Sequence, residues 1–101
     1  LGGLWEFPGG KIQEGENAKK CVIRKVNEKS GVRVSPRKLL KQIKHAYSHF
    51  SITLDAYHCD YIDGSPEKIG YGNWRWIFPR QITDLPFSKV NHKLFDQIQG
   101  D

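Results

Sequence analysis

The sequence predicts an α+β (mixed α/β) domain in which helices flank a twisted mixed β-sheet. Residues 17–30 repeat apolar side chains every three or four positions, which is typical of an amphipathic helix. Residues 50–61 alternate apolar and polar side chains, which is typical of a half-buried strand. The 101 residues suffice for one domain with a modest core, and helices and strands alternate without a regular βαβ series.

The N-terminal segment, residues 1–7, is mostly apolar and predicts a short, largely buried strand. Pro8, Gly9 and Gly10 then predict a sharp turn. Because the chain begins inside an apolar segment and without methionine, we expect it to be a fragment of a longer protein.

The predicted helix runs from about Asn17 to Ser30. Its apolar stripe consists of Ala18, Cys21, Val22 and Val26. Gly31 is well placed to end the helix, since glycine adopts a left-handed conformation with little strain. We interpret Cys21, and Cys59 in a later strand, as reduced packing thiols, because their spacing matches no metal motif.

Residues 36–44 are basic and poorly periodic. We expect apolar side chains of this segment to pack and its lysines to face water; the first group is Leu39, Leu40 and Ile43, and the second is Lys38, Lys41 and Lys44. In the alternating strand, the side chains predicted to share the buried face are Phe50, Ile52, Leu54 and Ala56.

The C-terminal third begins with WRWIF, residues 74–78, which predicts a short strand with its tryptophans in the core. Residues 82–87 predict a loop. Ser88 is a candidate N-cap for a last helix, whose inward-facing side chains are expected to be Val90, Leu94 and Ile98.

The formal net charge of +5 and the pI near 9.3 favour polyanionic partners such as nucleic acid. The sequence has neither a signal peptide nor an apolar run of membrane-spanning length. We therefore expect a bacterial cytoplasmic protein without a membrane partner.

A spaced motif follows the first turn and resembles the Nudix box. That family signature is a glycine, five residues, a glutamate, seven residues, and then R-E-U-x-E-E-x-G-U, where U is bulky and aliphatic. The positions that match are Gly10, Glu16, Arg24, Val26, Glu28, Gly31 and Val32. The resemblance implies a Nudix-like fold, in which Glu16 and Arg24 tie the loop to the helix by a charge-assisted hydrogen bond.

The departures from this motif fall on one helix face, at Lys25, Glu28 and Lys29. In active Nudix members, the resemblance implies, three glutamates on this face bind Mg²⁺. Here two ammonium groups and one carboxylate give a net charge of about +1 instead of −3. A unit charge pair about 4 Å apart is worth roughly 4 kcal/mol near a protein surface. We therefore predict no tight metal site and no catalytic residues; the lysines are either a solvated face or phosphate contacts.

Three segments together, GGLWEFPGGKIQEGE, residues 45–59 and residues 74–95, resemble the C-terminal domain of bacterial MutY-type adenine DNA glycosylases. The resemblance implies that residues 1–101 form one Nudix-like domain, a C-terminal fragment that recognises 8-oxoguanine opposite adenine in duplex DNA during base excision repair. It also implies no cofactor in this fragment. The partners would be the DNA and a preceding catalytic domain of the same chain, which carries an iron–sulfur cluster and hydrolyses the N-glycosidic bond.

The lesion-reading loop of that family matches Tyr47, Ser48 and His49. Oxidation gives guanine an N7–H donor where it normally has an acceptor, and a serine hydroxyl can both donate and accept. The resemblance implies that Ser48 contacts the Hoogsteen edge of the lesion, which this chemistry fits, and we expect His49 to contact phosphate or brace the loop. Basic residues expected to meet DNA phosphates precede this loop: Arg37, Lys38, Lys41 and Lys44.

Two other functions fit the same residues. One is a Nudix hydrolase acting on oxidised nucleoside triphosphates, with an alternative metal site formed by Glu14, Glu16 and Glu28. The other is a protein-interaction domain whose charged surface docks a partner such as a clamp or a mismatch-repair factor.

Overall fold

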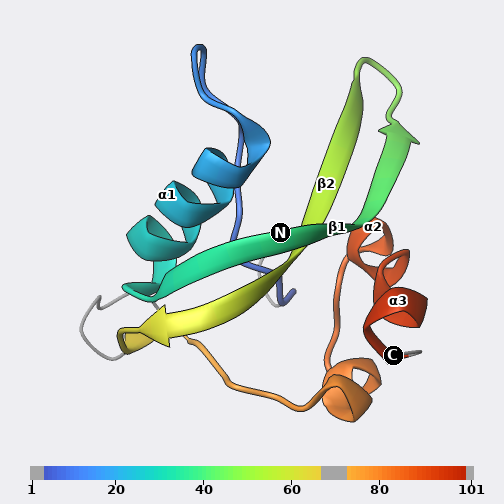
Figure 1. Cartoon of the computed structure of the whole chain (residues 1–101). Coiled ribbons are helices and arrows are strands. Elements are labelled where there is room, and N and C mark those ends of the chain that lie inside the picture. The colour runs from blue at the N-terminus through green and yellow to red at the C-terminus, as the bar shows by residue number, and fades with distance from the viewer. Residues whose placement is uncertain (1–3, 67–72, 100–101) are drawn as a thin grey trace. The chain divides into compact units, whose positions relative to one another are not determined.

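The computed structural model describes residues 4–66 and 73–99 of the chain (Figure 1). The elements in chain order are α1 (Ala18–Ser30), β1 (Arg33–Ala46), β2 (Ser51–Asp63), the 3-10 helix η2 (Pro79–Asp84), α2 (Lys89–His92) and α3 (Phe95–Gln99). Strands β1 and β2 pair as a two-stranded antiparallel hairpin (Figure 1). The predicted α+β class, with helices beside a β-sheet, is confirmed.

The chain divides into two compact units. The first unit consists of residues 1–7, 40–56 and 76–101, and the second unit consists of residues 8–39 and 57–75. Both strands of the hairpin contribute residues to each unit. Among the residues that the structure describes, no helix is long and apolar enough to cross a membrane.

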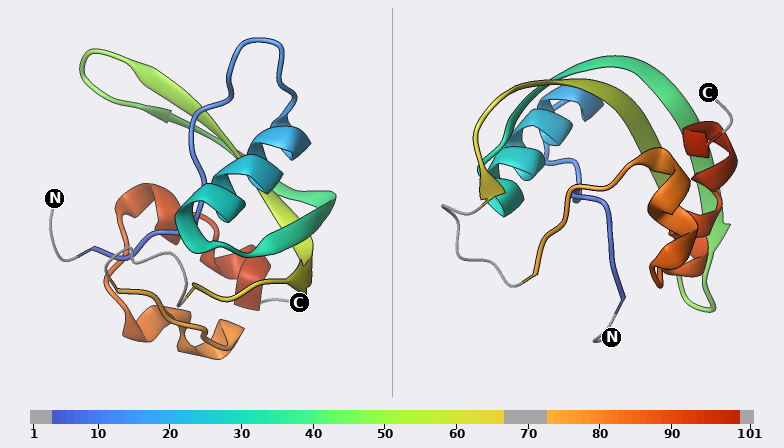
Figure 2. Two further views of the ribbon diagram at one scale, coloured as in Figure 1. Left: turned by 90° about the vertical axis from the view of Figure 1, so that its left-hand side faces the viewer. Right: turned by 90° about the horizontal axis from the view of Figure 1, so that it is seen from below.

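In the second unit, α1 begins and ends where the sequence predicts. The Asn17 side chain accepts a hydrogen bond from the Lys20 backbone N–H at 2.8 Å, which satisfies a free donor of the first turn. Gly31 adopts a left-handed conformation, with φ of 71°, and its N–H donates to the Asn27 carbonyl. The turn that follows leads directly into β1 (Figure 2). Cys21 and Val26 are buried on the predicted stripe.

The hairpin differs from the prediction for residues 36–44, because this basic segment is the middle of a regular strand, β1. Ile43 is buried as expected, whereas Leu39 is exposed. Lys41 is half-buried, and its ammonium donates to the Lys93 carbonyl at 2.8 Å, so it does not simply face water. A lysine with a long apolar stem can cover a strand face in this way while its charge finds a partner.

In β2, the predicted alternation is confirmed from Ser51 to Leu54. Ile52 and Leu54 are half-buried, whereas Ser51 and Thr53 are exposed. Phe50 was expected on the same buried face, and this is wrong. It precedes the strand and is 61% exposed.

The core of the first unit is aromatic. Ile82 is 1% exposed and clusters with Phe87 and Phe95. The rings of Phe7 and Phe87 stack with centroids 5.0 Å apart, and those of Phe87 and Phe95 meet edge to face at 5.5 Å. Such pairs stabilise a core by about 0.5–1.5 kcal/mol beyond their buried area. This cluster joins η2 to α3, which lie together in Figure 2.

Two predicted strands do not form among the described residues. The N-terminal segment makes a single parallel bridge between Trp5 and Phe87, supported by a hydrogen bond from the Trp5 N–H to the Pro86 carbonyl. Residues 74–78 have no regular structure, and Trp76 is 64% exposed rather than in the core. Both segments have strand-like composition, but within residues 4–66 and 73–99 neither one joins the β1–β2 sheet.

The last predicted helix is divided into α2 and α3. Val90 and Leu94 are buried and Ile98 is half-buried, so the predicted inward face is confirmed. Ser88 stands at the N-cap of α2, but its hydroxyl accepts from the Asn91 side chain at 3.0 Å instead of from a backbone N–H. The loop predicted for residues 82–87 contains part of η2.

Candidate functional site

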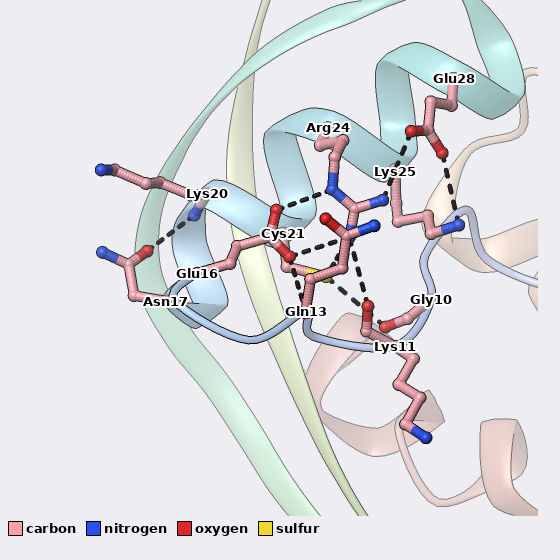
Figure 3. A network of polar contacts seen from close by, with 10 residues as sticks. All are labelled: Gly10, Lys11, Gln13, Glu16, Asn17, Lys20, Cys21, Arg24, Lys25 and Glu28. Atoms are coloured by element: carbon pink, nitrogen blue, oxygen red, sulfur yellow. Dashed lines mark hydrogen bonds and ion pairs between the residues drawn. The ribbon is translucent and has the colours of Figure 1, made fainter.

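A carboxylate–guanidinium clamp holds the loop before α1 against the helix (Figure 3). Arg24 Nε donates to Glu16 Oε2 at 2.7 Å, and Arg24 Nη2 donates to Glu16 Oε1 at 2.8 Å. Arg24 Nη2 also reaches the Lys11 carbonyl, and the Gln13 backbone N–H donates to Glu16 at 3.0 Å. The two hydrogen bonds from Arg24, followed by the one from Gln13, lower the pKa of Glu16 to about 2. The predicted structural tie between Glu16 and Arg24 is thereby confirmed.

The helix face that follows carries Lys25, Glu28 and Lys29. Glu28 Oε2 lies 3.3 Å from the Lys25 ammonium, and Glu28 Oε1 lies 3.3 Å from Arg24 Nη1 (Figure 3). The hydrogen bond from Lys25, and then that from Arg24, lower the pKa of Glu28 below its ordinary value. Both oxygens of this carboxylate therefore already face cations of the protein.

The Lys25 side chain also lies directly over Gly10. A β-carbon built on Gly10 would stand 2.6 Å from Lys25 Cε and 2.7 Å from Lys25 Cδ, closer than real contacts allow. Cys21 contacts the same turn, because its thiol donates to the Gly10 carbonyl oxygen at 3.6 Å. Burial raises the pKa of the Cys21 thiol, as expected for a packing residue, and both Cys21 and Cys59 are free thiols.

The described residues do not fit a divalent metal ion. Within residues 4–66 and 73–99, no three His, Cys, Asp or Glu side chains are grouped so that they would hold one. The alternative site of Glu14, Glu16 and Glu28 is not assembled, because Glu14 is exposed and the other two carboxylates are bound by Arg24. The absence of tight Mg²⁺ binding itself stays a prediction.

The hairpin end, in the first unit, carries the residues predicted to read a base. Ser48 and His49 are exposed in the bend between β1 and β2. The Tyr47 N–H donates to the Phe50 carbonyl at 2.7 Å, and the two rings stack with centroids 4.7 Å apart. His45 packs edge-on against Tyr47 at 4.7 Å.

Sequence reasoning missed the contribution of three residues to this end: His45, Phe50 and Lys93. The Lys93 ammonium lies 2.9 Å from His45 Nδ1, although the two residues are far apart in sequence. Alternation placed Phe50 in the core because a two-residue period cannot show where a strand begins.

The basic residues expected to contact phosphates are differently engaged. Arg37 lies 3.6 Å from Asp60, and Lys41 is bound to the Lys93 carbonyl. Lys38 and Lys44 are exposed on β1. Binding roles for these four residues, and for Tyr47, Ser48 and His49, stay predictions.

The chain belongs to the Nudix family, since the NUDIX domain model matches residues 1–97. It is 37% identical over 54 residues to an 8-oxo-dGTP diphosphatase of Proteus vulgaris, a match covering 54% of this chain and 48% of that protein. It is 30% identical over 97 residues to the 8-oxo-dGTP diphosphatase of Buchnera aphidicola subsp. Schizaphis graminum, covering 95% of this chain and 72% of that protein. The chain therefore spans about half the length of the Proteus protein and about three quarters of the length of the Buchnera protein.

Two further proteins are similar at lower sequence identity. A CTP pyrophosphohydrolase of Escherichia coli is 23% identical over 98 residues, covering 97% of this chain and 73% of that protein. The solution structure of the E. coli ORF135 protein superposes with a TM-score of 0.84 at 22% identity, covering 97% of this chain and 70% of that chain. At this identity, the structural likeness shows the Nudix-like fold alone.

These relatives overturn the expectation that the domain recognises 8-oxoguanine opposite adenine for a DNA glycosylase. Their names are those of nucleotide hydrolases, and neither they nor the family match supports a glycosylase parent. The error has a chemical cause. The same oxidised base occurs in DNA and in a free nucleotide, so residues suited to its edge do not distinguish the two. The expected partners and the iron–sulfur cluster of a preceding domain stay predictions.

Replacing Glu16 by glutamine should destabilise the protein at neutral pH, because the clamp loses its charge. The folded-state pKa of Glu16 is about 2, below its ordinary value of 4.5, so its ionisation stabilises the fold fully above about pH 4.5. That contribution is lost as the pH falls toward 2. The difference in melting temperature between the wild type and Glu16→Gln should therefore shrink from pH 6 to about pH 2. Thermal melts across this range measure it.

Glu14→Gln is the matched control for this experiment, because Glu14 lies in the same loop and is exposed. A melting-temperature difference between the wild type and Glu16→Gln that stays constant with pH would contradict the assignment of the clamp.

Proposed function

We propose that this chain is a Nudix hydrolase domain that acts on an oxidised purine nucleoside triphosphate of the 8-oxo-dGTP type, with slow turnover. The relatives support the substrate class, since two of those reported above are named for 8-oxo-dGTP and the alignment to one covers nearly the whole chain. The charge supports it as well, because a chain of net charge +5 attracts a triphosphate.

The observation that carries the proposal is the Glu16–Arg24 clamp. It fixes the loop that begins at Gly10 onto α1, with both guanidinium–carboxylate hydrogen bonds under 3 Å. A bidentate arginine–carboxylate pair fixes the relative orientation of two segments more strictly than a lysine–carboxylate pair does. The loop–helix scaffold of the family is therefore retained, although two of its acid positions are lysines.

Slow turnover follows from those lysines. A helix face with two ammonium groups offers charge to the phosphates of a nucleotide, but it does not offer the carboxylates that would hold a divalent ion. The Glu16–Arg24 clamp orients the loop, and the lysines of α1 supply positive charge. We accordingly expect strong nucleotide binding relative to a low rate of hydrolysis.

The proposal is tested with the purified chain and three nucleotides: 8-oxo-dGTP, dGTP and CTP. A ligand that binds only the folded state stabilises it by about 2.7 kcal/mol at one hundred times its dissociation constant. We expect 8-oxo-dGTP to raise the melting temperature more than dGTP or CTP does. Chromatography should show slow conversion of 8-oxo-dGTP to its monophosphate. Equal responses to all three nucleotides, or none, would sink the proposal.

A matched pair of variants separates the clamp from general destabilisation. Arg24→Gln breaks the pair with Glu16, whereas Arg33→Gln breaks a similar bidentate pair with Asp63, at 2.8 and 2.7 Å, outside the motif. Only Arg24→Gln should reduce the response to 8-oxo-dGTP.

A further inference from the structure

Lys25 and Glu28 form an internal ion pair in the place where the family motif has two acid side chains. The Lys25 ammonium lies 3.3 Å from Glu28 Oε2, and its side chain is only about a quarter exposed (25%). Glu28 is thus held on one oxygen by Lys25 and on the other by Arg24.

The Lys25 stem lies over Gly10. The three outer methylene carbons of Lys25 approach to 2.6, 2.7 and 3.0 Å of the point where a β-carbon of residue 10 would stand. Glycine at residue 10 leaves room for the stem in this position, and a side chain there would make the flexible stem move. Figure 3 shows Gly10 and Lys25 near one another. The ammonium is directed along the helix to Glu28, as Figure 3 shows.

We propose that the Lys25 ammonium is a built-in cation, which neutralises Glu28 and excludes a divalent ion from this helix face. The inference goes beyond the proposed function, because it concerns the ion that the face accepts and not the nucleotide that the domain takes. Lys29, one turn from Lys25 on the same face, adds a second positive charge. Together the three side chains carry a net +1, and replacing both lysines by glutamate makes it −3.

The test measures Mn²⁺ and Mg²⁺ alone, without nucleotide, by titration calorimetry and by the shift in melting temperature. The wild type should show no saturable binding at millimolar ion. The double variant Lys25→Glu, Lys29→Glu should bind Mn²⁺ at least about 100-fold more tightly, since four units of charge change within a few ångströms of the ion. Adding Glu28→Gln to that variant should remove most of the gain.

A matched control is available on the same helix. Lys19→Glu with Lys20→Glu changes the net charge equally, but both residues are exposed in the first turn of α1. This control should leave the Mn²⁺ affinity near that of the wild type. That outcome would show that the position of the charges, and not the total charge, determines the affinity for the ion.

Three results would overturn the inference: saturable Mn²⁺ binding by the wild type that Glu28→Gln abolishes, a folded double variant that binds no ion, or equal gains in the variant and its control. Should the double variant fail to fold by circular dichroism, Lys25→Gln with Lys29→Gln removes the positive charge without adding negative charge. That neutral pair should still gain about tenfold in Mn²⁺ affinity, and no gain would equally overturn the inference. Loss of nucleotide selectivity in the separate experiment above would leave this result unaffected.

Discussion

Replacing Ile82 by alanine is expected to lower the free energy of unfolding by about 2–5 kcal/mol. Ile82 is 1% exposed and packs with Phe87 and Phe95, so the deleted methyl groups leave a cavity among rigid rings. Aromatic side chains have few rotamers with which to refill that space. In a domain of this size we expect the melting temperature to fall by roughly 8 °C or more. Differential scanning calorimetry or urea denaturation measures the change.

Ile62→Ala is the control for this prediction, because Ile62 is 50% exposed on β2. It should cost no more than about 0.5 kcal/mol. Equal losses in the two variants would mean that the cluster around Ile82 is not the core of the first unit.

Replacing Gly64 by alanine is the second change with a large expected effect. The added β-carbon would clash with the Gly31 carbonyl oxygen and would stand 2.9 Å from Val32 Cα. These are backbone atoms of the turn between α1 and β1, so they cannot rotate away as a side chain would. Gly64 also has a φ of 104°, which an alanine adopts only with strain. We expect a loss of roughly 3 kcal/mol in unfolding free energy, from overpacking and strain together.

Two other glycines separate these causes. Gly15 has a positive φ of 77° but open space around its would-be β-carbon, so Gly15→Ala should cost about 1 kcal/mol from strain alone. Gly9 has open space and no positive φ, so Gly9→Ala should be neutral or slightly stabilising. A Gly64→Ala variant as stable as Gly15→Ala would show that the turn at Gly31 is not where the structure places it.

The sequence predicts helix α1 well because its limits are local. The apolar stripe and the glycine at position 31 lie within a few residues of one another, and the cap by Asn17 that the structure shows is local as well. The Glu16–Arg24 tie was predictable for the same reason, since a spaced motif fixes both partners. The pairing of Lys25 with Glu28 follows from positions on one helix face, but the contact of Lys25 with Gly10 joins a turn to a helix and has no local signal.

The failures concern elements that need a distant partner. Residues 74–78 have the composition of a strand, yet nothing in the sequence shows whether another strand lies beside them. Apolar character predicts Trp76 in the core and alternation predicts Phe50 there, although large apolar side chains also occur on surfaces. The function was misjudged for a related reason. The motif at residues 10–32 identifies the family, but it does not show whether the molecule that the domain takes is DNA or a free nucleotide.

The hairpin has a further consequence for how the protein unfolds. Residues 33–39 and 57–63 of β1 and β2 lie in one unit, and residues 40–46 and 51–56 lie in the other. Because each strand contributes residues to both units, we expect denaturant to unfold the two units in a single cooperative step rather than in sequence.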